Sequence, residues 1–362
     1  MPVVAYKEAY KEPVLVACSN NNLKKNNIDY NNDKGFIFAP FDVEKNDTFL
    51  IPFDFKIENN TLLLLNNDND ILKKYEYYNQ EVSLSYKNNF FYQEKLIPNY
   101  SKQDFCDLVE KIVTDIKQNN TDKIIASRTL KVKLDDNFDS IELFNKLTKK
   151  YTNAFISLVC IPNVGTWIGA TPETLLDINN KRINTMAVAG TQKFNSKNKE
   201  IYWENKEINE HQYVIDYIKN VFDKYNITYK IEPTTNLIAG SVVHIITKFS
   251  GELQNKTNLN NLILDFHPTP AVCGLSKNKA MDFILKNEKH KREYYTGFLG
   301  KLNIDNTTSL YVNLRCMQLL KDNAYLYLGN GIVEDSIPEK EWNETESKAD
   351  ILLSVLKSKV NT

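Results

Sequence analysis

The sequence has few of the residues that disulfides, zinc sites and phosphate-binding loops require. Among its 362 residues there are 5 cysteines, 4 histidines and 11 glycines. The cysteines are odd in number and widely spaced, and no histidine has another histidine three to five residues away. These spacings exclude a disulfide framework, a zinc cluster and a zincin-type site, and they favour reduced, buried thiols. Any metal should therefore be a hard cation held by carboxylates, which favours Mg²⁺.

Long apolar runs and an excess of one charge are also missing. The longest apolar stretches, at residues 14–18 and 154–162, are shorter than the roughly 18–20 residues of a membrane-spanning helix. Residues 1–8 do not resemble a secretory signal. The 45 basic and 46 acidic residues give a net charge of −1, without the basic patch of a nucleic-acid surface. We expect a folded, cytoplasmic protein that binds neither membrane nor nucleic acid.

The apolar pattern predicts strands first and a mixture of helices and strands later. Residues 1–100 alternate short apolar clusters with Asn- and Asp-rich turns, which is typical of short strands. Beyond residue 100, apolar periodicity predicts helices at residues 101–116, 140–150, 201–225, 258–265, 277–286 and 336–356. The first starts at a capping signal of Ser101 and Asp104, and the last at a capping box of Ser336 and Glu339. Strands are predicted at residues 123–128, 154–161, 166–168, 173–176, 182–189, 241–248, 297–303, 309–319 and 324–333.

No linker rich in proline, glycine or serine separates residues 101 and 357. The prediction is therefore one α+β domain over residues 1–362, in which antiparallel sheets pack as a sandwich with helices on their outer faces. Residues 1–100 would contribute strands to this body, and residues 101–362 would carry the functional motifs.

Two of the predicted helices carry acidic residues on one face. Glu207 and Glu210 are three residues apart, and Glu341, Glu344 and Lys348 share a face of the last helix. Two such faces could clamp one Mg²⁺ between them. The same residues are compatible with solvated helix surfaces and with an exposed Glu344–Lys348 ion pair.

Three further residues have apolar neighbours. Lys123 precedes the run Ile-Ile-Ala, and Glu173 follows Trp-Ile-Gly-Ala-Thr-Pro. Burial lowers the pKa of a lysine and raises the pKa of a glutamate, which would create a base and an acid; a structural ion pair between the two is the alternative. Arg315 also lies between apolar residues, and its planar guanidinium suits a carboxylate.

Seven segments resemble those of the chorismate-utilising enzymes, a family of isochorismate synthases, salicylate synthases, anthranilate synthase large subunits and aminodeoxychorismate synthases. They occur in the family's order and extend from about residue 101 to the end of the chain. They are residues 167–173 (Trp-Ile-Gly-Ala-Thr-Pro-Glu), 189–191 (Ala-Gly-Thr), 206–211 (Lys-Glu-Ile-Asn-Glu-His), 267–274 (His-Pro-Thr-Pro-Ala-Val-Cys-Gly), 292–297 (Arg-Glu-Tyr-Tyr-Thr-Gly), 329–333 (Gly-Asn-Gly-Ile-Val) and 341–348 (Glu-Trp-Asn-Glu-Thr-Glu-Ser-Lys).

The resemblance implies the fold of the anthranilate synthase component I-like enzymes and, within the family, an isochorismate synthase. Members that add water to the ring carry a lysine that Lys123 resembles. Lys123 would take a proton from a water that attacks C2 of chorismate, and Glu173 would protonate the hydroxyl that leaves C4. Salicylate synthases tend to have threonine at the position of Ala271. No feedback-site motif of the anthranilate-type enzymes is recognisable near the N-terminus.

The resemblance also implies the ligands of the site. Glu210 and Glu344 would bind Mg²⁺, with Glu207 and Glu341 behind them. Arg315 and Lys348 would grip the enolpyruvyl carboxylate. The implied substrate-binding residues are Ala189, Gly190, Thr191, His267, Ala271, Val272, Tyr295, Arg315, Gly329 and Lys348. No glutamine amidotransferase subunit is expected, because the implied nucleophile is water, and a monomer is expected.

Three positions depart from the family pattern, and two alternatives stay open. Ser276 replaces a usual proline at a helix start, Asn330 replaces alanine between two glycines, and residues 313–316 are a loose version of the Ile-Arg strand. The alternatives are a salicylate synthase, against which Ala271 argues, and a catalytically silent chorismate-binding protein. Whether the product would serve a menaquinone or a siderophore pathway is left open by the residues.

Overall fold

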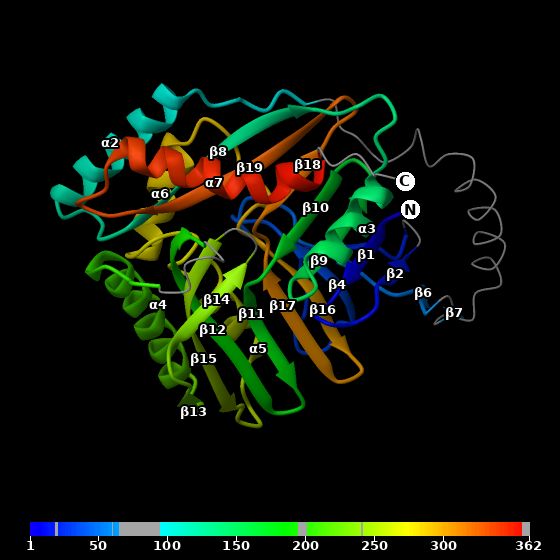
Figure 1. Cartoon of the computed structure of the whole chain (residues 1–362). Coiled ribbons are helices and arrows are strands. Elements are labelled where there is room, and N and C mark those ends of the chain that lie inside the picture. Colours follow the sequence, from blue (N-terminus) through cyan, green and yellow to red (C-terminus); the bar gives the residue numbers. More distant parts are fainter. Residues whose placement is uncertain (19–20, 60, 65–94, 195–200, 240–241, 357–362) are drawn as a thin grey trace.

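Two antiparallel sheets form the body of the computed structural model, which describes residues 1–18, 21–59, 61–64, 95–194, 201–239 and 242–356 (Figure 1). The first sheet has nine strands in the order β7-β6-β2-β1-β9-β10-β18-β19-β8. Their bounds are β7 (Thr61–Leu64), β6 (Phe55–Glu58), β2 (Val14–Ala17), β1 (Val3–Lys7), β9 (Phe155–Ile161), β10 (Gly165–Thr171), β18 (Cys316–Leu319), β19 (Asn323–Ile332) and β8 (Ile124–Lys133).

The second sheet has ten strands in the order β13-β15-β12-β11-β17-β16-β4-β5-β3, and a further strand, β14, also pairs with β15. Their bounds are β13 (Thr228–Ile231), β15 (Val242–Glu252), β12 (Arg182–Lys193), β11 (Thr174–Asn179), β17 (Thr307–Val312), β16 (Phe298–Ile304), β4 (Gly35–Ala39), β5 (Phe49–Ile51), β3 (Lys24–Lys25) and β14 (Thr235–Ala239). The early strands β1 and β4 pair with β9 and β16, so the N-terminal region contributes to both sheets.

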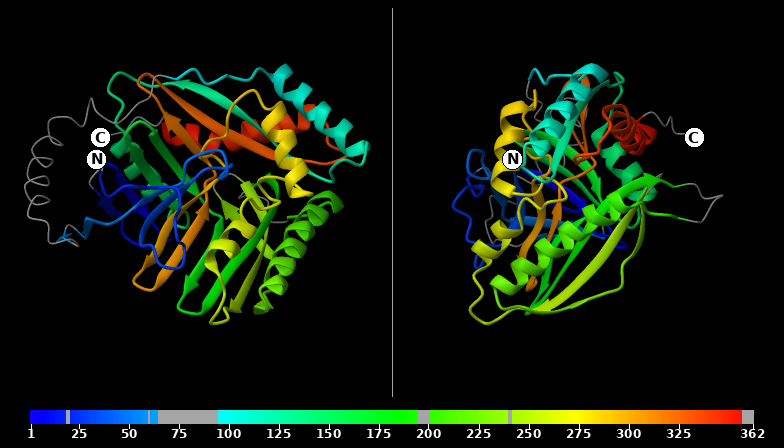
Figure 2. Two further views of the ribbon diagram at one scale, coloured as in Figure 1. Left: turned by 180° about the vertical axis from the view of Figure 1, so that it is seen from behind. Right: turned by 90° about the vertical axis from the view of Figure 1, so that its left-hand side faces the viewer.

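Helices cover the outer faces of the sheets (Figure 2). The described helices are α2 (Lys102–Lys117), α3 (Ser140–Lys150), α4 (Asn205–Lys224), α5 (Leu259–Phe266), α6 (Lys277–Asn287) and α7 (Pro338–Leu356). Helix α4 packs on β12 and β15, α3 on β9, and α2 and α7 on each other and on β19. No helix among the described residues is both long and apolar enough to cross a bilayer.

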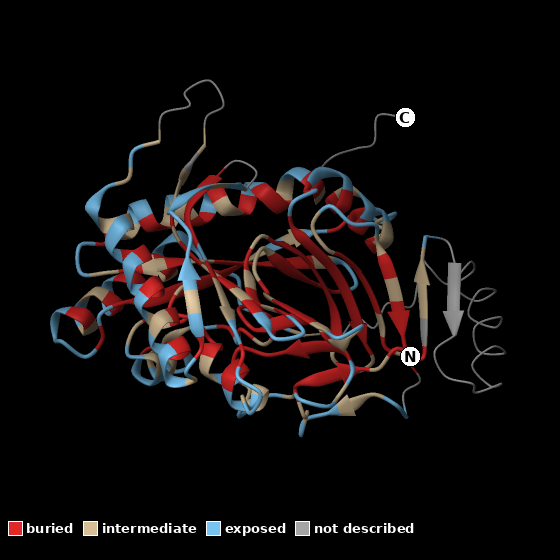
Figure 3. Cartoon of the chain, turned by 90° about the horizontal axis from the view of Figure 1, so that it is seen from below, coloured by how far each residue is buried: buried red, intermediate tan, exposed pale blue. Residues whose placement is uncertain are grey.

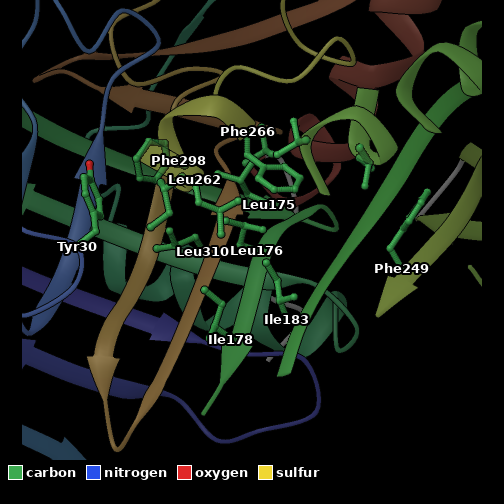
Figure 4. Close-up of a cluster of buried hydrophobic side chains, with 14 of the residues drawn as sticks. Tyr30, Leu175, Leu176, Ile178, Ile183, Phe249, Leu262, Phe266, Phe298 and Leu310 are labelled. Carbon is green, nitrogen blue, oxygen red and sulfur yellow. The ribbon is translucent and has the colours of Figure 1, made fainter. Parts of the chain in front are cut away.

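Separate apolar clusters hold these layers together. Aromatic rings from both sheets meet in the middle, for example Phe155 stacked on Tyr311 at 4.0 Å between ring centroids. Viewed from below, the buried strands occupy the interior and the exposed residues gather on the helices and loops (Figure 3). A second cluster seats α4 and α5 on the ten-stranded sheet, and Leu262 and Phe266 of α5 point toward Leu175 there (Figure 4). The α+β sandwich that the sequence predicts is confirmed.

Some local predictions were wrong. Residues 309–319 form two strands in different sheets, because the chain turns at Arg315, whose φ is 48°. The capping box predicted at Ser336 does not form, since the Ser336 hydroxyl accepts from Val333 N and Glu339 pairs with Lys102 instead. Ser276 precedes α6 without a capping bond from its side chain. Strands β13 and β14 were not predicted.

Candidate active site

A cavity of about 140 Å³ opens between the two sheets, next to α4 and α7. It is bordered by β8 and β19 of the nine-stranded sheet, by β12 and β15 of the other, and by the turn between β10 and β11. Fourteen of the residues that the sequence singled out line it: Lys123, Glu173, Ala189, Gly190, Thr191, Glu207, Glu210, Ala271, Val272, Tyr295, Arg315, Glu344, Lys348 and Gly329. Residues from nine separate stretches of the chain thus meet in one place.

Two of the singled-out residues lie behind this lining. Nε2 of His267 is 2.9 Å from the carbonyl oxygen of Phe41, and the ring packs on Phe298. Its place does not support the contact with substrate that the resemblance implied. Glu341 accepts a bond of 2.8 Å from Lys206 Nζ, and Asn330 Nδ2 donates to its other oxygen. The Asn330 side chain therefore bonds β19 to Glu341 of α7.

Lys123 has the most deeply buried basic side chain of the cavity. It directly precedes β8, and its side chain is 2 % exposed. Its Nζ lies 3.3 Å from Oε2 of Glu210 on α4. Its backbone is fixed as well, because Leu275 N donates to Lys123 O at 2.9 Å. The lysine is thus held between β8, α4 and the segment that precedes α6.

Glu173 occupies the turn between β10 and β11, where the chain passes from one sheet to the other. The residue is buried, and its backbone N donates to Thr171 Oγ1 at 3.3 Å. Burial raises the pKa of the Glu173 carboxyl to about 8, against the opposing effect of the Arg315 and Lys123 charges. At neutral pH the carboxyl therefore keeps its proton, as a general acid requires.

Arg315 has a partner that the sequence analysis missed. Its Nη2 lies 2.6 Å from Nε2 of His244 on β15, and Nδ1 of His244 lies 3.1 Å from the carbonyl oxygen of Gly190. Burial, together with the Arg315 and Lys348 charges, lowers the pKa of His244 to about 3, so the ring is neutral. Nδ1 must then donate to Gly190 and Nε2 must accept from Arg315.

His244 thereby connects two of the predicted ligand contacts. It orients the Arg315 guanidinium and holds Gly190, which has a φ of 65° at a bulge in β12. From the sequence, His244 was only a histidine within a predicted strand. Its partners lie 71 and 54 residues away, so spacing could not have identified them.

On the opposite wall, Lys348 of α7 reaches the strand β19. Its Nζ donates to Gly329 O at 2.9 Å and lies 2.8 Å from Glu344 Oε1. The Glu344–Lys348 pair lines the cavity, so it is not the solvated helix-surface pair considered as an alternative. The ammonium is available to an anion bound in the cavity.

The acidic side chains fit a hard divalent cation. Burial lowers the pKa of Lys206 on α4, but the nearby carboxylates of Glu341, Glu210 and Glu344 have the larger effect and raise it. This concentration of negative charge suits Mg²⁺, which proteins commonly bind through one or two carboxylates together with substrate and water. Within the described residues, no group of three or more potential ligands is arranged to hold a metal alone. A bound substrate would have to complete the coordination.

Comparison with known proteins finds curated relatives of similar sequence. The sequence is 27 % identical over 273 residues to anthranilate synthase component 1 of Acetivibrio thermocellus, covering 71 % of this chain and 54 % of that protein. It is 27 % identical over 242 residues to isochorismate synthase EntC of Escherichia coli K12, covering 65 % of this chain and 62 % of that protein. The chain thus spans little more than half the length of these curated relatives.

A solved structure shares the fold. The menaquinone-specific isochorismate synthase MenF of Escherichia coli superposes with a TM-score of 0.78 at 20 % sequence identity, over 99 % of this chain and 89 % of that one. Residues 42–357 also match the family described as chorismate binding enzyme. The protein therefore belongs to the chorismate binding enzymes, as the resemblance of its seven segments implied.

Proposed function

We propose that the protein is an isochorismate synthase, which converts chorismate reversibly to isochorismate. The observation that carries this proposal is the placement of Lys123 and Glu173 on one cavity, a buried amine and a buried carboxyl that keeps its proton at neutral pH. In the family that the sequence resembles, a lysine at this position accompanies the addition of water rather than ammonia. The relatives named isochorismate synthase support the same reaction.

The chemistry requires one group to accept a proton and another to supply one. The Lys123 amine, in its neutral form, takes a proton from the water that attacks C2 of chorismate. The Glu173 carboxyl gives its proton to the hydroxyl that leaves C4. Each role is general acid–base catalysis, which typically contributes about 10²–10⁴-fold.

Cationic side chains and backbone groups orient the substrate. In this proposal Arg315 and Lys348 hold the enolpyruvyl carboxylate, and the bulge at residues 189–191 binds the ring carboxylate; all of these residues line the cavity. Glu210 and Glu344 would hold Mg²⁺, with Glu207 and Glu341 close to them. When bound, the ion supplies positive charge that offsets these carboxylates and the ring carboxylate.

Ala271 favours this reaction over pyruvate elimination. It lines the cavity, where salicylate synthases tend to carry threonine. Its methyl group offers no hydroxyl to the substrate. A salicylate synthase is therefore the less favoured of the two candidates.

Product analysis tests the proposal directly. We expect purified protein to convert chorismate with Mg²⁺ to an equilibrium mixture with isochorismate, to lose this activity with EDTA and to regain it when Mg²⁺ is restored. Salicylate and pyruvate as products would establish a salicylate synthase, and anthranilate formed with ammonium would establish an ammonia-using enzyme. Binding of chorismate without any conversion would indicate a catalytically silent chorismate-binding protein.

The acid role of Glu173 predicts how activity depends on pH. Because its pKa is about 8, the carboxyl is protonated below that pH and loses its proton above it. Where the Lys123 amine is already neutral, we expect kcat/KM to fall about tenfold per pH unit above this value, since the deprotonated form of Glu173 cannot supply the proton. Steady-state rates between pH 6 and about pH 10 measure this dependence of kcat/KM on pH. A kcat/KM that rises steadily through this range would contradict the role.

The closeness of Gly331 to Lys123 leads to a second prediction. A Cβ at Gly331 would lie 2.8 Å from Lys123 Cε and 3.1 Å from Glu210 Oε2. We expect Gly331→Ala to displace the amine and to lower kcat by about 10²-fold, since small misplacements of reacting groups have effects of that size. Gly251→Ala is the matched control, because its Cβ would meet Ile227 and Thr228 far from the cavity. Equal kcat values for the two variants would contradict the prediction.

A further inference from the structure

The segment that precedes β16 contains a buried ion pair that the proposed reaction does not use. The side chains of Arg292 and Glu288 are 1 % and 3 % exposed. Arg292 Nη2 donates to Glu288 Oε1 at 2.6 Å, and Arg292 Nε donates to Oε2 at 2.9 Å. Charges this deeply buried are retained only with several compensating bonds, so the remaining partners of the pair indicate what it does.

The other bonds of Arg292 reach two walls of the cavity. Nη1 donates to Val272 O at 2.8 Å, and Nη2 donates to Ile125 O at 2.7 Å. Val272 and Ile125 both line the cavity. The guanidinium also lies over two rings, 4.6 Å from the centroid of Phe41 and 5.9 Å from that of Tyr295. One planar group thus joins β8, the segment after α5 and the chain before β16.

Glu288 strengthens the same junction. Its Oε1 accepts from Ser127 N at 2.9 Å and from Ser127 Oγ at 2.8 Å. Next to it, Ile125 N donates to Cys273 O at 2.9 Å and Leu275 N donates to Lys123 O at 2.9 Å. The backbone that carries the Lys123 amine is therefore fixed at the Lys123 carbonyl group and along the strand that follows it.

Tyr295 and Thr296 are bonded to Arg292 as well. Glu293 and Thr296 have φ values of 50° and 59°, a left-handed conformation that non-glycine residues adopt at a cost. Tyr295 N donates to Arg292 O at 2.9 Å, and Arg292 Nη1 lies 3.4 Å from Thr296 Oγ1. Such backbone persists only where its surroundings hold it. Tyr295 and Thr296 line the cavity, so the held conformation forms part of the substrate site.

We infer that Arg292, paired with Glu288, is a positioning residue for the reaction: it fixes the Lys123 amine relative to Val272 and Tyr295 across the cavity. The inference rests on the proposed function, because it takes Lys123 as the base. Neither Arg292 nor Glu288 lines the cavity, so they act through the residues that they hold. Arg315 and Lys348, which hold the substrate carboxylate, are bonded to other partners and keep their places.

The test is Arg292→Lys. Lysine keeps a positive charge opposite Glu288 but cannot bond both carbonyl groups and both carboxylate oxygens at once. We expect kcat for isochorismate formation to fall by at least about tenfold, with the KM for chorismate within about threefold of the parent value. Glu288→Gln, which keeps the shape of the side chain, should lower kcat in the same direction and replaces Arg292→Lys if that variant does not fold.

A control separates positioning from stability. Phe249→Leu removes buried aromatic volume from the cluster under α4 and should lower the melting temperature while leaving kcat per folded molecule unchanged. The inference is overturned if kcat per folded molecule of Arg292→Lys, or of Glu288→Gln in its place, stays within about twofold of the parent. If the parent itself forms no isochorismate, the proposed function fails and the inference fails with it. An active parent with unchanged variants overturns the inference alone.

Discussion

Replacing Glu173 by glutamine should lower kcat for isochorismate formation by about 10²–10⁴-fold. Glutamine has the size of glutamate but cannot supply a proton to the hydroxyl that leaves C4. Because the carboxyl is protonated at neutral pH, the substitution removes no charge there, and chorismate should still bind. Steady-state kcat and KM, together with a chorismate dissociation constant from calorimetry, measure the two effects separately.

Glu252→Gln is the matched control for this substitution. Glu252 lies exposed at the end of β15, so the same chemical change there should leave kcat unaltered. A Glu173→Gln enzyme that turns over chorismate within about tenfold of the parent would remove Glu173 from the acid role. The decline in kcat/KM above pH 8 should also disappear in this variant, since the group that titrates there is gone.

Replacing Lys123 by methionine should have an effect of similar size, about 10²–10⁴-fold on kcat, because no amine remains to accept a proton from the attacking water. Methionine retains most of the length of the side chain and contacts Gly331 with apolar atoms. The substitution also leaves the Glu210 carboxylate without its partner at 3.3 Å. Melting temperatures must therefore accompany the rates, so that kcat is given per folded molecule.

Lys111→Met on the exposed face of α2 is the control for Lys123→Met. It removes an ammonium far from the cavity and should change neither kcat nor KM. The smaller variant Lys123→Ala offers a further check, because small primary amines added to the solution should restore part of its activity. An Ala variant as active as the parent would show that Lys123 is not the base.

Local sequence signals were sufficient where short-range interactions decide the structure. The helix predicted at residues 140–150 is α3 as the structure has it, and Ser101 and Asp104 form the capping box that the sequence predicts for α2. A helix start depends on bonds between residues three apart, and an apolar face repeats within one or two turns. Both can be read from neighbouring residues.

Side-chain placement was harder to predict where strands change sheets. The pattern at residues 309–319 predicts one strand, yet the chain leaves the ten-stranded sheet at Val312 and enters the nine-stranded sheet at Cys316. The turn between them, with Arg315 in the left-handed region, is what directs the guanidinium to the cavity. Alternating apolar residues fit both strands equally well, so periodicity cannot reveal such a break.

The sequence by itself determined the fold class and most of the helices, because these follow from local patterning, and its resemblance to a known family singled out residues such as Lys123 and Glu173 as candidates for the chemistry. Only the tertiary structure decided which of them meet. Lys123 faces Glu210 across 87 residues of chain, and His244 joins Gly190, on the neighbouring strand, to Arg315 in the turn between the two sheets. Such partners are set by how sheets and helices pack, and the protonation of a buried group follows from those partners and from burial.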